Sequence, residues 1–406
     1  MRDTPASPSF WRSPLRGPWF TSVLGLVLLV GVTVLFVTGL LSYAAYNPGL
    51  NPVNDKTPDK GILGFYLFTW PTSPHWLYRL TQGVHVTLGV TLIPVLLAKL
   101  WSVVPKLFAL PPARSLTHAL ERLSLLLLVG GGLFEFVTGV LNVQLDYLFP
   151  GSFYPLHFYG AWVFFAAFVA HAVLKVPAAV RNVRRAREEG SLVAPRPDPP
   201  TVSRRGALWF VGGGSLLLFA TTVGQGFDGP ARRTALLAPH GGADPGAGPN
   251  GFQINKTAAY AGIDRAETAD DAWRLVVVGR SGTVRLSRAE LARMPLYSAA
   301  LPIACVEGWS TSDQWWRGVR LRDLAALVGE GGDPPDVLVE SLQRRGAFRH
   351  AALRANQVAD PRSLLALYVN GEPLSPDHGH PARVIVPAAP GVLNTKWVAR
   401  LTFGKV

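Results

Sequence analysis

Five long apolar runs alternate with short polar segments over the first part of the chain. They cover about residues 19–43, 80–98, 119–143, 154–173 and 206–227. A helix that crosses a bilayer needs about 20 mainly apolar residues, and each run comes close to that length. The pattern therefore predicts an all-α transmembrane bundle of five spans.

Beyond residue 252 the pattern changes to short apolar runs separated by turns. Strands are predicted at 273–279, 336–342, 364–370, 382–388 and 396–403, and helices at 287–294 and 319–329. Ser287 and Glu290 form a Ser-x-x-Glu capping box, and Asn370-Gly371 is typical of a tight hairpin turn. Mixed strands and short helices predict one α+β domain over 252–406.

These patterns predict a multi-domain chain. Its expected parts are an N-terminal segment (1–18), a four-helix membrane domain (19–180), a basic linker (181–205), a fifth span (206–227), a Gly- and Pro-rich linker (228–251) and the α+β domain (252–406).

The chain has a formal net charge of +13, and the positions of its cations along the sequence are informative. The cations gather before the first span, between the second and third, and most densely between residues 175 and 205. Cations in short loops mark the cytoplasmic side of a membrane protein, so this distribution favours a lipid bilayer rather than nucleic acid as the partner. It predicts a multi-pass protein of the cytoplasmic membrane, with a cytoplasmic N-terminus and an extracytoplasmic α+β domain.

The fifth span opens with "SRRGALWF" at residues 203–210. Its S-R-R-x-x-L spacing is similar to a twin-arginine export signal. The alternative is that Arg204 and Arg205 are ordinary charges on the inner side of the membrane. The full spacing favours the export signal.

Histidines in the apolar runs are candidate haem ligands. His157 and His171 lie 14 residues apart in the fourth span, which places them on one helix face about 21 Å apart. His85 in the second span and His118 in the third have matching depths. We expect His85 with His157 and His118 with His171 to bind one b haem each, as the axial ligands of its iron.

The alternative for these histidines is hydrogen bonding to water or headgroups at helix ends. Glu135 in the third span could relay a proton or bond within the bundle. The first four spans resemble membrane cytochrome b families that anchor periplasmic oxidoreductases, through these histidines and the "VTG" sequences at 37–39 and 137–139. The first span lacks the histidine that several such families carry.

Cys305, in "IACVEGWS", is the single cysteine of the chain. A thiolate is a soft ligand that suits a thiol-loving metal. The alternative is a buried small apolar residue, which is the common role of a free cysteine. The sequence around it decides between the two.

The α+β region resembles the molybdopterin-binding domain of the sulfite oxidase family. The resemblance is carried, in order, by "FQINKT" (252–257), "ACVEGWS" (304–310), "WWRGVRLRDL" (315–324), "LALYVNGEPLSPDHGHPARVIVP" (365–387) and "NTKW" (394–397). It implies a molybdenum–molybdopterin cofactor, with Cys305 as the metal ligand.

The resemblance also implies which residues contact the cofactor. A dithiolene phosphate is anionic and needs cations and hydrogen-bond donors. The implied set is Phe252, Asn255, Thr257, Trp309, Ser310, His378, Arg383, Asn394, Thr395 and Lys396.

The segment after Cys305 lacks the arginine with which sulfite oxidases bind an oxyanion. It is similar to the branch containing the periplasmic methionine sulfoxide reductase catalytic subunit. We therefore expect an enzyme that passes electrons from quinone through b haems to molybdenum and reduces a small S- or N-oxide. The alternatives are a sulfite-type dehydrogenase running in the oxidative direction, and a catalytically silent, anchored binding module.

Overall fold

The structure is a computed structural model of the chain. It describes residues 12–13, 15–50, 68–105, 115–143, 153–186, 193, 202–239, 244–346 and 348–404. The chain forms two compact units. The first comprises residues 1–37, 85–141 and 156–222, and the second comprises 38–84, 142–155 and 223–406.

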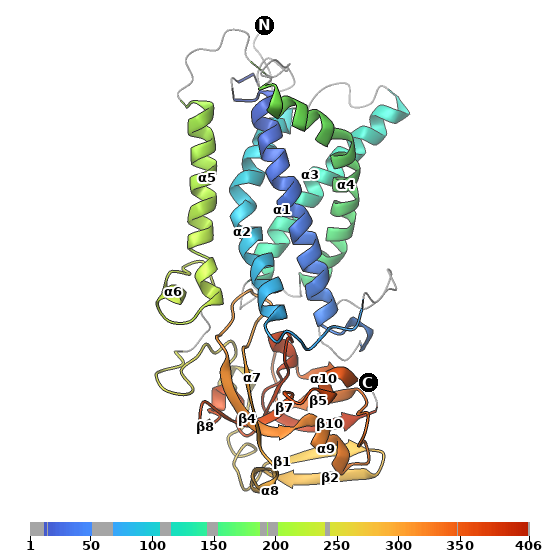
Figure 1. The fold of residues 1–406 in the computed structure, drawn as a ribbon, viewed down its shortest axis with the longest axis vertical. Coiled ribbons are helices and arrows are strands. Elements are labelled where there is room, and N and C mark those ends of the chain that lie inside the picture. The colour runs from blue at the N-terminus through green and yellow to red at the C-terminus, as the bar shows by residue number, and fades with distance from the viewer. Residues whose placement is uncertain are drawn as a thin grey trace. The chain divides into compact units, whose positions relative to one another are not determined.

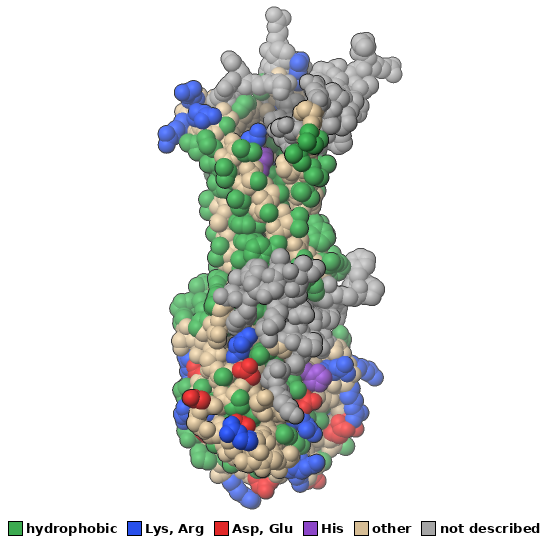
Figure 2. Space-filling view, turned by 90° about the vertical axis from the view of Figure 1, so that its right-hand side faces the viewer, with side chains coloured by type: hydrophobic (Ala, Val, Ile, Leu, Met, Phe, Trp, Pro, Cys, Tyr) green, Lys and Arg blue, Asp and Glu red, His purple; other side chains and the backbone are tan. Residues whose placement is uncertain are grey.

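Five long helices are present where apolar runs predict them (Figure 1). They are α1 (Pro18–Ala45), α2 (Leu77–Val103), α3 (Leu116–Asn142), α4 (Tyr154–Arg184) and α5 (Arg204–Ala220). Five segments, the last one reaching from α5 to Gly226, are long and apolar enough to cross a membrane. The surface around the helices in Figure 2 is mostly hydrophobic, whereas the surface of the strand-containing region mixes acidic and basic side chains.

Local chemistry explains where the fifth helix begins. The Ser203 hydroxyl accepts a hydrogen bond from Gly206 N at 3.1 Å and so caps α5. Capping accounts for the serine of the predicted twin-arginine sequence, and export stays a prediction. In the first unit, α1 and α2 share a buried apolar cluster of Phe20, Leu24, Leu28, Leu92 and Val95.

The second unit contains two five-stranded sheets. The first has the order β2-β1-β10-β5-β6, and the second has the order β3-β4-β7-β8 with β9 on β7. The strands are β1 (Arg274–Gly279), β2 (Gly282–Ser287), β3 (Tyr297–Leu301), β4 (Gln314–Arg320), β5 (Val337–Ser341), β6 (His350–Leu353), β7 (Leu364–Val369), β8 (Glu372–Pro373), β9 (Arg383–Ile385) and β10 (Val398–Phe403).

Short helices complete this unit. They are α6 (Pro230–Arg233), α7 (Ala258–Ala261), α8 (Arg288–Arg293), α9 (Leu321–Leu327) and α10 (Ala355–Ala359), with single 3-10 turns at Pro48–Leu50, Val223–Gly226, Pro376–His378 and Gly391–Leu393. The predicted α+β fold is confirmed. The predicted helix at 319–329 begins two residues later than expected, because Val319 and Arg320 still pair with β7.

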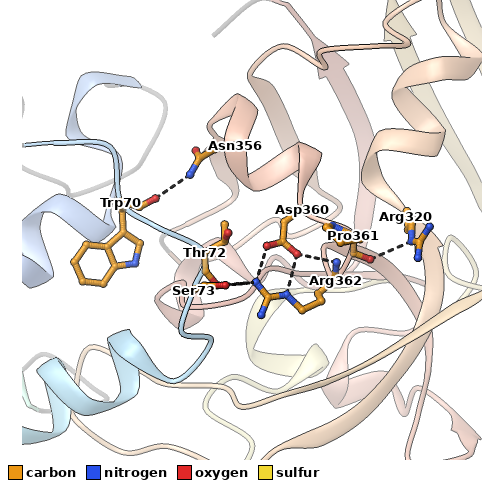
Figure 3. A network of polar contacts seen from close by, with 8 residues as sticks. All are labelled: Trp70, Thr72, Ser73, Arg320, Asn356, Asp360, Pro361 and Arg362. Carbon is orange, nitrogen blue, oxygen red and sulfur yellow. Dashed lines mark hydrogen bonds and ion pairs between the residues drawn. The ribbon is translucent and has the colours of Figure 1, made fainter.

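The described ends of the connection between α1 and α2, residues 46–50 and 68–76, are part of the second unit. Trp70 Nε1 donates to Ala388 O at 2.7 Å, and Asn356 Nδ2 donates to Trp70 O at 2.9 Å. Arg362 donates to Thr72 O and also pairs with Asp360 (Figure 3). The second unit is therefore assembled from segments that lie far apart in the sequence.

Candidate active site

A tight turn presents Cys305. Its backbone N–H donates to Trp309 O at 2.9 Å, and Gly308 N donates back to Cys305 O at 3.1 Å. Gly308 adopts a φ of +90°, a conformation that side chains disfavour. Ala304 bridges to Ser310 and to Pro390, so the turn is fixed on both sides. The thiol is buried, with 3% of the residue exposed.

The surroundings of the thiol keep it protonated. Burial raises the pKa of Cys305 well above its ordinary value, and the nearby Glu307 carboxyl raises it further. Burial likewise raises the pKa of Glu307, although a hydrogen bond with the thiol opposes this change. A buried thiol of this kind is unreactive by itself, and a bound metal would have to displace its proton.

Three buried side chains of basic character gather beside the thiol. They are His378, Arg383 and Lys396, which are 1%, 3% and 9% exposed. Burial lowers the pKa of Arg383 to about 9, and the Cys305 thiol partly opposes the shift. Burial and the neighbouring Arg383 and Lys256 lower the pKa of Lys396 well below its ordinary value. Such a cluster suits an anionic ligand, because an anion would compensate the buried cations.

The hydrogen bonds within the cluster hold it in place. Lys396 Nζ donates to Lys256 O and Asp377 O, both at 2.8 Å. Arg383 Nη1 donates to His378 O at 3.3 Å, and its guanidinium lies 5.5 Å from the Trp316 ring centroid. The cations are therefore oriented before any ligand arrives.

Buried donors without a protein partner test whether the cofactor fits. Arg383 Nε, Asn394 Nδ2 and Thr395 Oγ1 are buried and make no hydrogen bond within the described structure. Unsatisfied buried donors are costly, so their presence beside the cations indicates an acceptor-rich partner. A phosphate and a pterin ring supply such acceptors, and the residues present fit the molybdenum cofactor.

The other predicted contacts have visible local roles. Phe252 is buried, and its ring stacks on His378 with centroids 3.8 Å apart. The Thr257 hydroxyl accepts from Tyr260 N and caps α7. Ser310 Oγ donates to Gly226 O at 3.3 Å, while Trp309 is 1% exposed and Asn255 is half-buried. These roles neither require nor exclude cofactor contact, and that contact stays a prediction.

Sequence reasoning missed several groups near the thiol. Glu307 lies two residues after Cys305 and interacts with it directly. The buried side chains of Tyr46 and Tyr78 also interact electrostatically with the thiol. The quoted "CVEGWS" contained the signal for Glu307, whereas nothing in the sequence connects the two tyrosines to residue 305.

The helices bring two of the predicted haem ligands together. The ring centroids of His85 and His157 are 6.2 Å apart, with planes at 89°. His85 Nδ1 donates to Leu35 O at 3.0 Å. His157 Nδ1 lies 3.1 Å from Glu135 Oε2 and 2.9 Å from Thr138 Oγ1.

The second predicted haem pair is described less fully. His171 lies half-buried on α4. His118 lies on α3, but its side chain is outside the described residues. Within the described residues, no group of three or more His, Cys, Asp or Glu could hold a metal ion. Metal binding at Cys305 would therefore depend on ligands from an organic cofactor.

Comparison with known families identifies the strand-containing region. Residues 262–406 match the family described as "Oxidoreductase molybdopterin binding domain". This part of the chain is a molybdopterin-binding oxidoreductase domain. The molybdopterin-binding domain confirms the predicted enzyme class and supports the predicted molybdenum–molybdopterin cofactor. The family match begins at residue 262 and does not include the long helices, so haem binding by these helices stays a prediction.

Several known proteins are similar to the molybdopterin-binding domain. The uncharacterized oxidoreductase YuiH of Bacillus subtilis (strain 168) is 33% identical over 134 residues, which cover 33% of this chain and 66% of YuiH. Mitochondrial sulfite oxidase of Homo sapiens is 32% identical over 158 residues, which cover 32% of this chain and 29% of the oxidase. A nitrate reductase of Hordeum vulgare is 42% identical over 94 residues, which cover 21% of this chain and 10% of the reductase. The chain thus spans less than two thirds of each relative.

Among solved structures, the sulfane dehydrogenase SoxCD from Paracoccus pantotrophus matches part of the chain. The match is 22% identical with a TM-score of 0.31, and it covers 34% of this chain and 39% of that one.

Proposed function

We propose that the chain is a membrane-anchored, molybdenum-dependent oxidoreductase on the outer face of the cytoplasmic membrane. The observation that carries the proposal is the buried Cys305 thiol beside Arg383, Lys396 and His378, with unsatisfied donors around it. When bound, the cofactor supplies a metal that changes oxidation state and exchanges an oxygen atom with the substrate.

The protein's own residues have distinct tasks in this proposal. Cys305 binds the metal as a thiolate, and the turn at Gly308 fixes its direction. Arg383 and Lys396 compensate the negative charge of the cofactor, because each lies within electrostatic range of the thiol. Asn394 and Thr395 complete the binding site through their unsatisfied donors.

Five apolar helices support membrane anchoring. If all five cross the bilayer, the molybdopterin-binding domain lies on the side opposite the N-terminus. The dense cations between residues 175 and 205 support a cytoplasmic N-terminus. Fusion to a reporter enzyme at residue 406 tests this topology, since activity on the cytoplasmic side would contradict it.

The pair His85–His157 supports a haem b in the helices. His85 and His157 would hold the iron of this haem, which would supply one-electron transfer, because their rings lie close together in the helices. The two ring centroids are 6.2 Å apart. His85 donates from Nδ1 to Leu35 O, which leaves its lone pair on Nε2, and ligating histidines usually donate their second nitrogen in this way. Nδ1 of His157 is engaged as well, by Glu135 Oε2 and Thr138 Oγ1. A second haem would use His118 and His171.

Spectra of dithionite-reduced protein test the haem proposal. We expect b-type bands that weaken when His85 or His157 is replaced by Ala. The matched control is His350→Ala, since His350 is exposed on β6. Absence of b-type bands from the wild-type protein would end the haem proposal and leave the molybdenum proposal standing.

We further propose that electrons flow from quinol to the cofactor and reduce a small S- or N-oxide. The net reaction for a sulfoxide is R2S=O + 2 e⁻ + 2 H⁺ → R2S + H2O. Oxidation of sulfite is the second candidate, favoured by the 32% identity to human sulfite oxidase. Stopped-flow mixing separates the two candidates, because sulfite would reduce the haems in the oxidative direction and an oxide would reoxidise them in the reductive one.

Metal analysis of detergent-purified protein tests the whole proposal. We expect molybdenum with an organic pterin in the wild-type protein. Cys305→Ser should abolish turnover and the thiolate-to-metal absorption while the helices and any haem remain. Wild-type protein without molybdenum would refute the proposal.

A further inference from the structure

Two tyrosines from outside the molybdopterin-binding domain reach the Cys305 site. Tyr46 follows the end of α1, and Tyr78 lies in the first turn of α2. They are 3% and 1% exposed, and both interact electrostatically with the Cys305 thiol. Tyr78 also interacts with Glu307. The residues after α1 and at the start of α2 therefore bring two phenol groups near the Cys305 thiol.

Packing fixes the tyrosines against the cysteine turn. Tyr46 and Tyr78 share a buried cluster with Ala304, and Val306 packs against the same cluster. The two phenol rings have centroids 6.4 Å apart and planes at 68°. Ala304 and Val306 flank Cys305 directly, so the tyrosines contact the turn at both of its neighbours.

Two hydrogen bonds anchor the start of α2 to the same turn. Gln82 Nε2 donates to Val306 O at 2.5 Å. Arg79 Nη2 donates to Gly226 O at 2.6 Å, and the same carbonyl accepts from Ser310 Oγ. One bond reaches the turn at Val306 and the other is linked through Gly226 O to Ser310, so the start of α2 that carries Tyr78 is fixed next to the cysteine turn.

The described part of this covering segment brings one full cation, Arg79, to the site. Within the described residues 38–50 and 68–84, the basic side chains are His75 and Arg79. His75 Nε2 lies 3.1 Å from Asp313 Oδ2, and Arg79 is bonded to Gly226 O. Phenol hydroxyls suit a neutral, strongly dipolar oxygen. An oxyanion would meet the Glu307 carboxyl, and the one full cation of the described covering segment, Arg79, is already bonded to Gly226 O.

We propose that Tyr46 and Tyr78 are substrate-binding residues whose hydroxyls donate hydrogen bonds to the oxygen of a neutral S- or N-oxide. This inference rests on the proposed function and adds a role for the described residues that follow α1 and open α2. The tyrosines bind and orient the oxide, while quinol supplies the two electrons and the solvent supplies the two protons of the net reaction.

The state of Tyr46 agrees with a donor role. Burial raises the pKa of Tyr46 well above its ordinary value, and Tyr78, Tyr154 and the Cys305 thiol raise it further. The hydroxyl therefore keeps its proton at neutral pH and can donate it in a hydrogen bond.

Full-length, molybdenum-loaded protein in detergent tests the inference, with dimethyl sulfoxide as the probe. A hydrogen bond to a neutral acceptor predicts that Tyr46→Phe and Tyr78→Phe each raise KM by about 3- to 10-fold. We expect kcat to change less, since each variant loses a binding contact. The matched control is Tyr260→Phe, an exposed tyrosine on α7 that should keep the wild-type KM.

A second measurement is independent of turnover. Dimethyl sulfoxide is titrated against the Mo(V) electron paramagnetic resonance signal, which counts only molecules that hold the metal, so partial loading does not obscure the result. The midpoint should rise in Tyr46→Phe and Tyr78→Phe by the same factor as KM. Wild-type KM and midpoint in both variants would overturn the inference alone. Loaded wild-type protein that reduces neither dimethyl sulfoxide nor trimethylamine N-oxide would refute the proposed reductase and the inference with it.

Discussion

The imidazole of His378 stacks on the ring of Phe252, with their centroids 3.8 Å apart and their planes at 23°. His378 Nε2 donates to Asn250 O at 2.8 Å. Burial lowers the pKa of His378 to about 3, and the charges of Arg383 and Lys396 act in the same direction. His378 is therefore a neutral hydrogen-bonding group at pH 7, held flat against an aromatic ring.

The depressed pKa of His378 predicts a pH dependence of stability in cofactor-free protein. Between pH 3 and the ordinary histidine value of 6.5, the unfolded chain binds a proton that the native chain does not. The free energy of unfolding should therefore be highest above pH 6.5 and fall by about 1 kcal/mol per pH unit between pH 6.5 and pH 3. His378→Gln should remove this component from melting curves, and equal pH profiles for both proteins would contradict the assignment.

Removing a buried cation should weaken cofactor binding. Lys396→Met and Arg383→Met each lose a charged hydrogen-bond donor, which predicts about 10- to 100-fold weaker retention of the anionic cofactor. Molybdenum and pterin content after dialysis measure the effect. Arg400→Met is the matched control, because Arg400 lies on β10 with its side chain 46% exposed. Full cofactor content in both buried variants would show that other groups bind the anion.

The Glu135–His157 contact predicts a shift in haem potential. In the proposed haem site, a Glu135 carboxylate that accepts from His157 Nδ1 would make the imidazole a stronger electron donor to iron and would stabilise the oxidised state. Glu135→Gln should therefore raise the midpoint potential in a spectroelectrochemical titration. Glu267→Gln, an exposed carboxyl near α7, should leave it unchanged. A potential that falls in Glu135→Gln would contradict the orienting role.

The network of Figure 3 predicts that Arg362 stabilises the join between segments. Its guanidinium contacts Asp360, Thr72 O and Ser73 Oγ, so Arg362→Ala removes the ion pair of a largely buried carboxyl and the donor to a carbonyl. The backbone N–H of residue 362 keeps its bond to Asp360 Oδ1. The expected cost is about 1–3 kcal/mol, measured as a lower melting temperature. Arg322→Ala is the control, since Arg322 forms an exposed ion pair with Asp323. Equal melting temperatures of the two variants would show that the network is dispensable.

Local sequence signals predicted much of the fold. The Ser287–Glu290 capping box begins α8, and Asn370 and Gly371 adopt φ values of 49° and 90° between β7 and β8. These features depend on neighbours within a few residues, so the sequence contains them. Strand β4 was missed because the last residues of "QWWRGVR" overlap a helical pattern.

The motifs named the residues of the candidate site. The structure brings Arg383 and Lys396 within electrostatic range of Cys305 and places His378 near these two side chains, and their cofactor contacts stay predictions. Their pKa values and the neutral state of His378 depend on burial, which no motif encodes. The contacts of Tyr46 and Tyr78 depend on the three-dimensional fold, because more than two hundred residues separate them from the cysteine turn.

The composite second unit has a consequence for biosynthesis. Asn47 Nδ2 donates to Ala352 O, which the ribosome adds 305 residues later. Asn47 must therefore stay accessible throughout translation of the intervening chain, and the second unit can mature only after its last strand has emerged. Expression of residues 223–406 alone would omit Asn47 and Trp70, which bond to Ala352, Asn356 and Ala388 in the second unit.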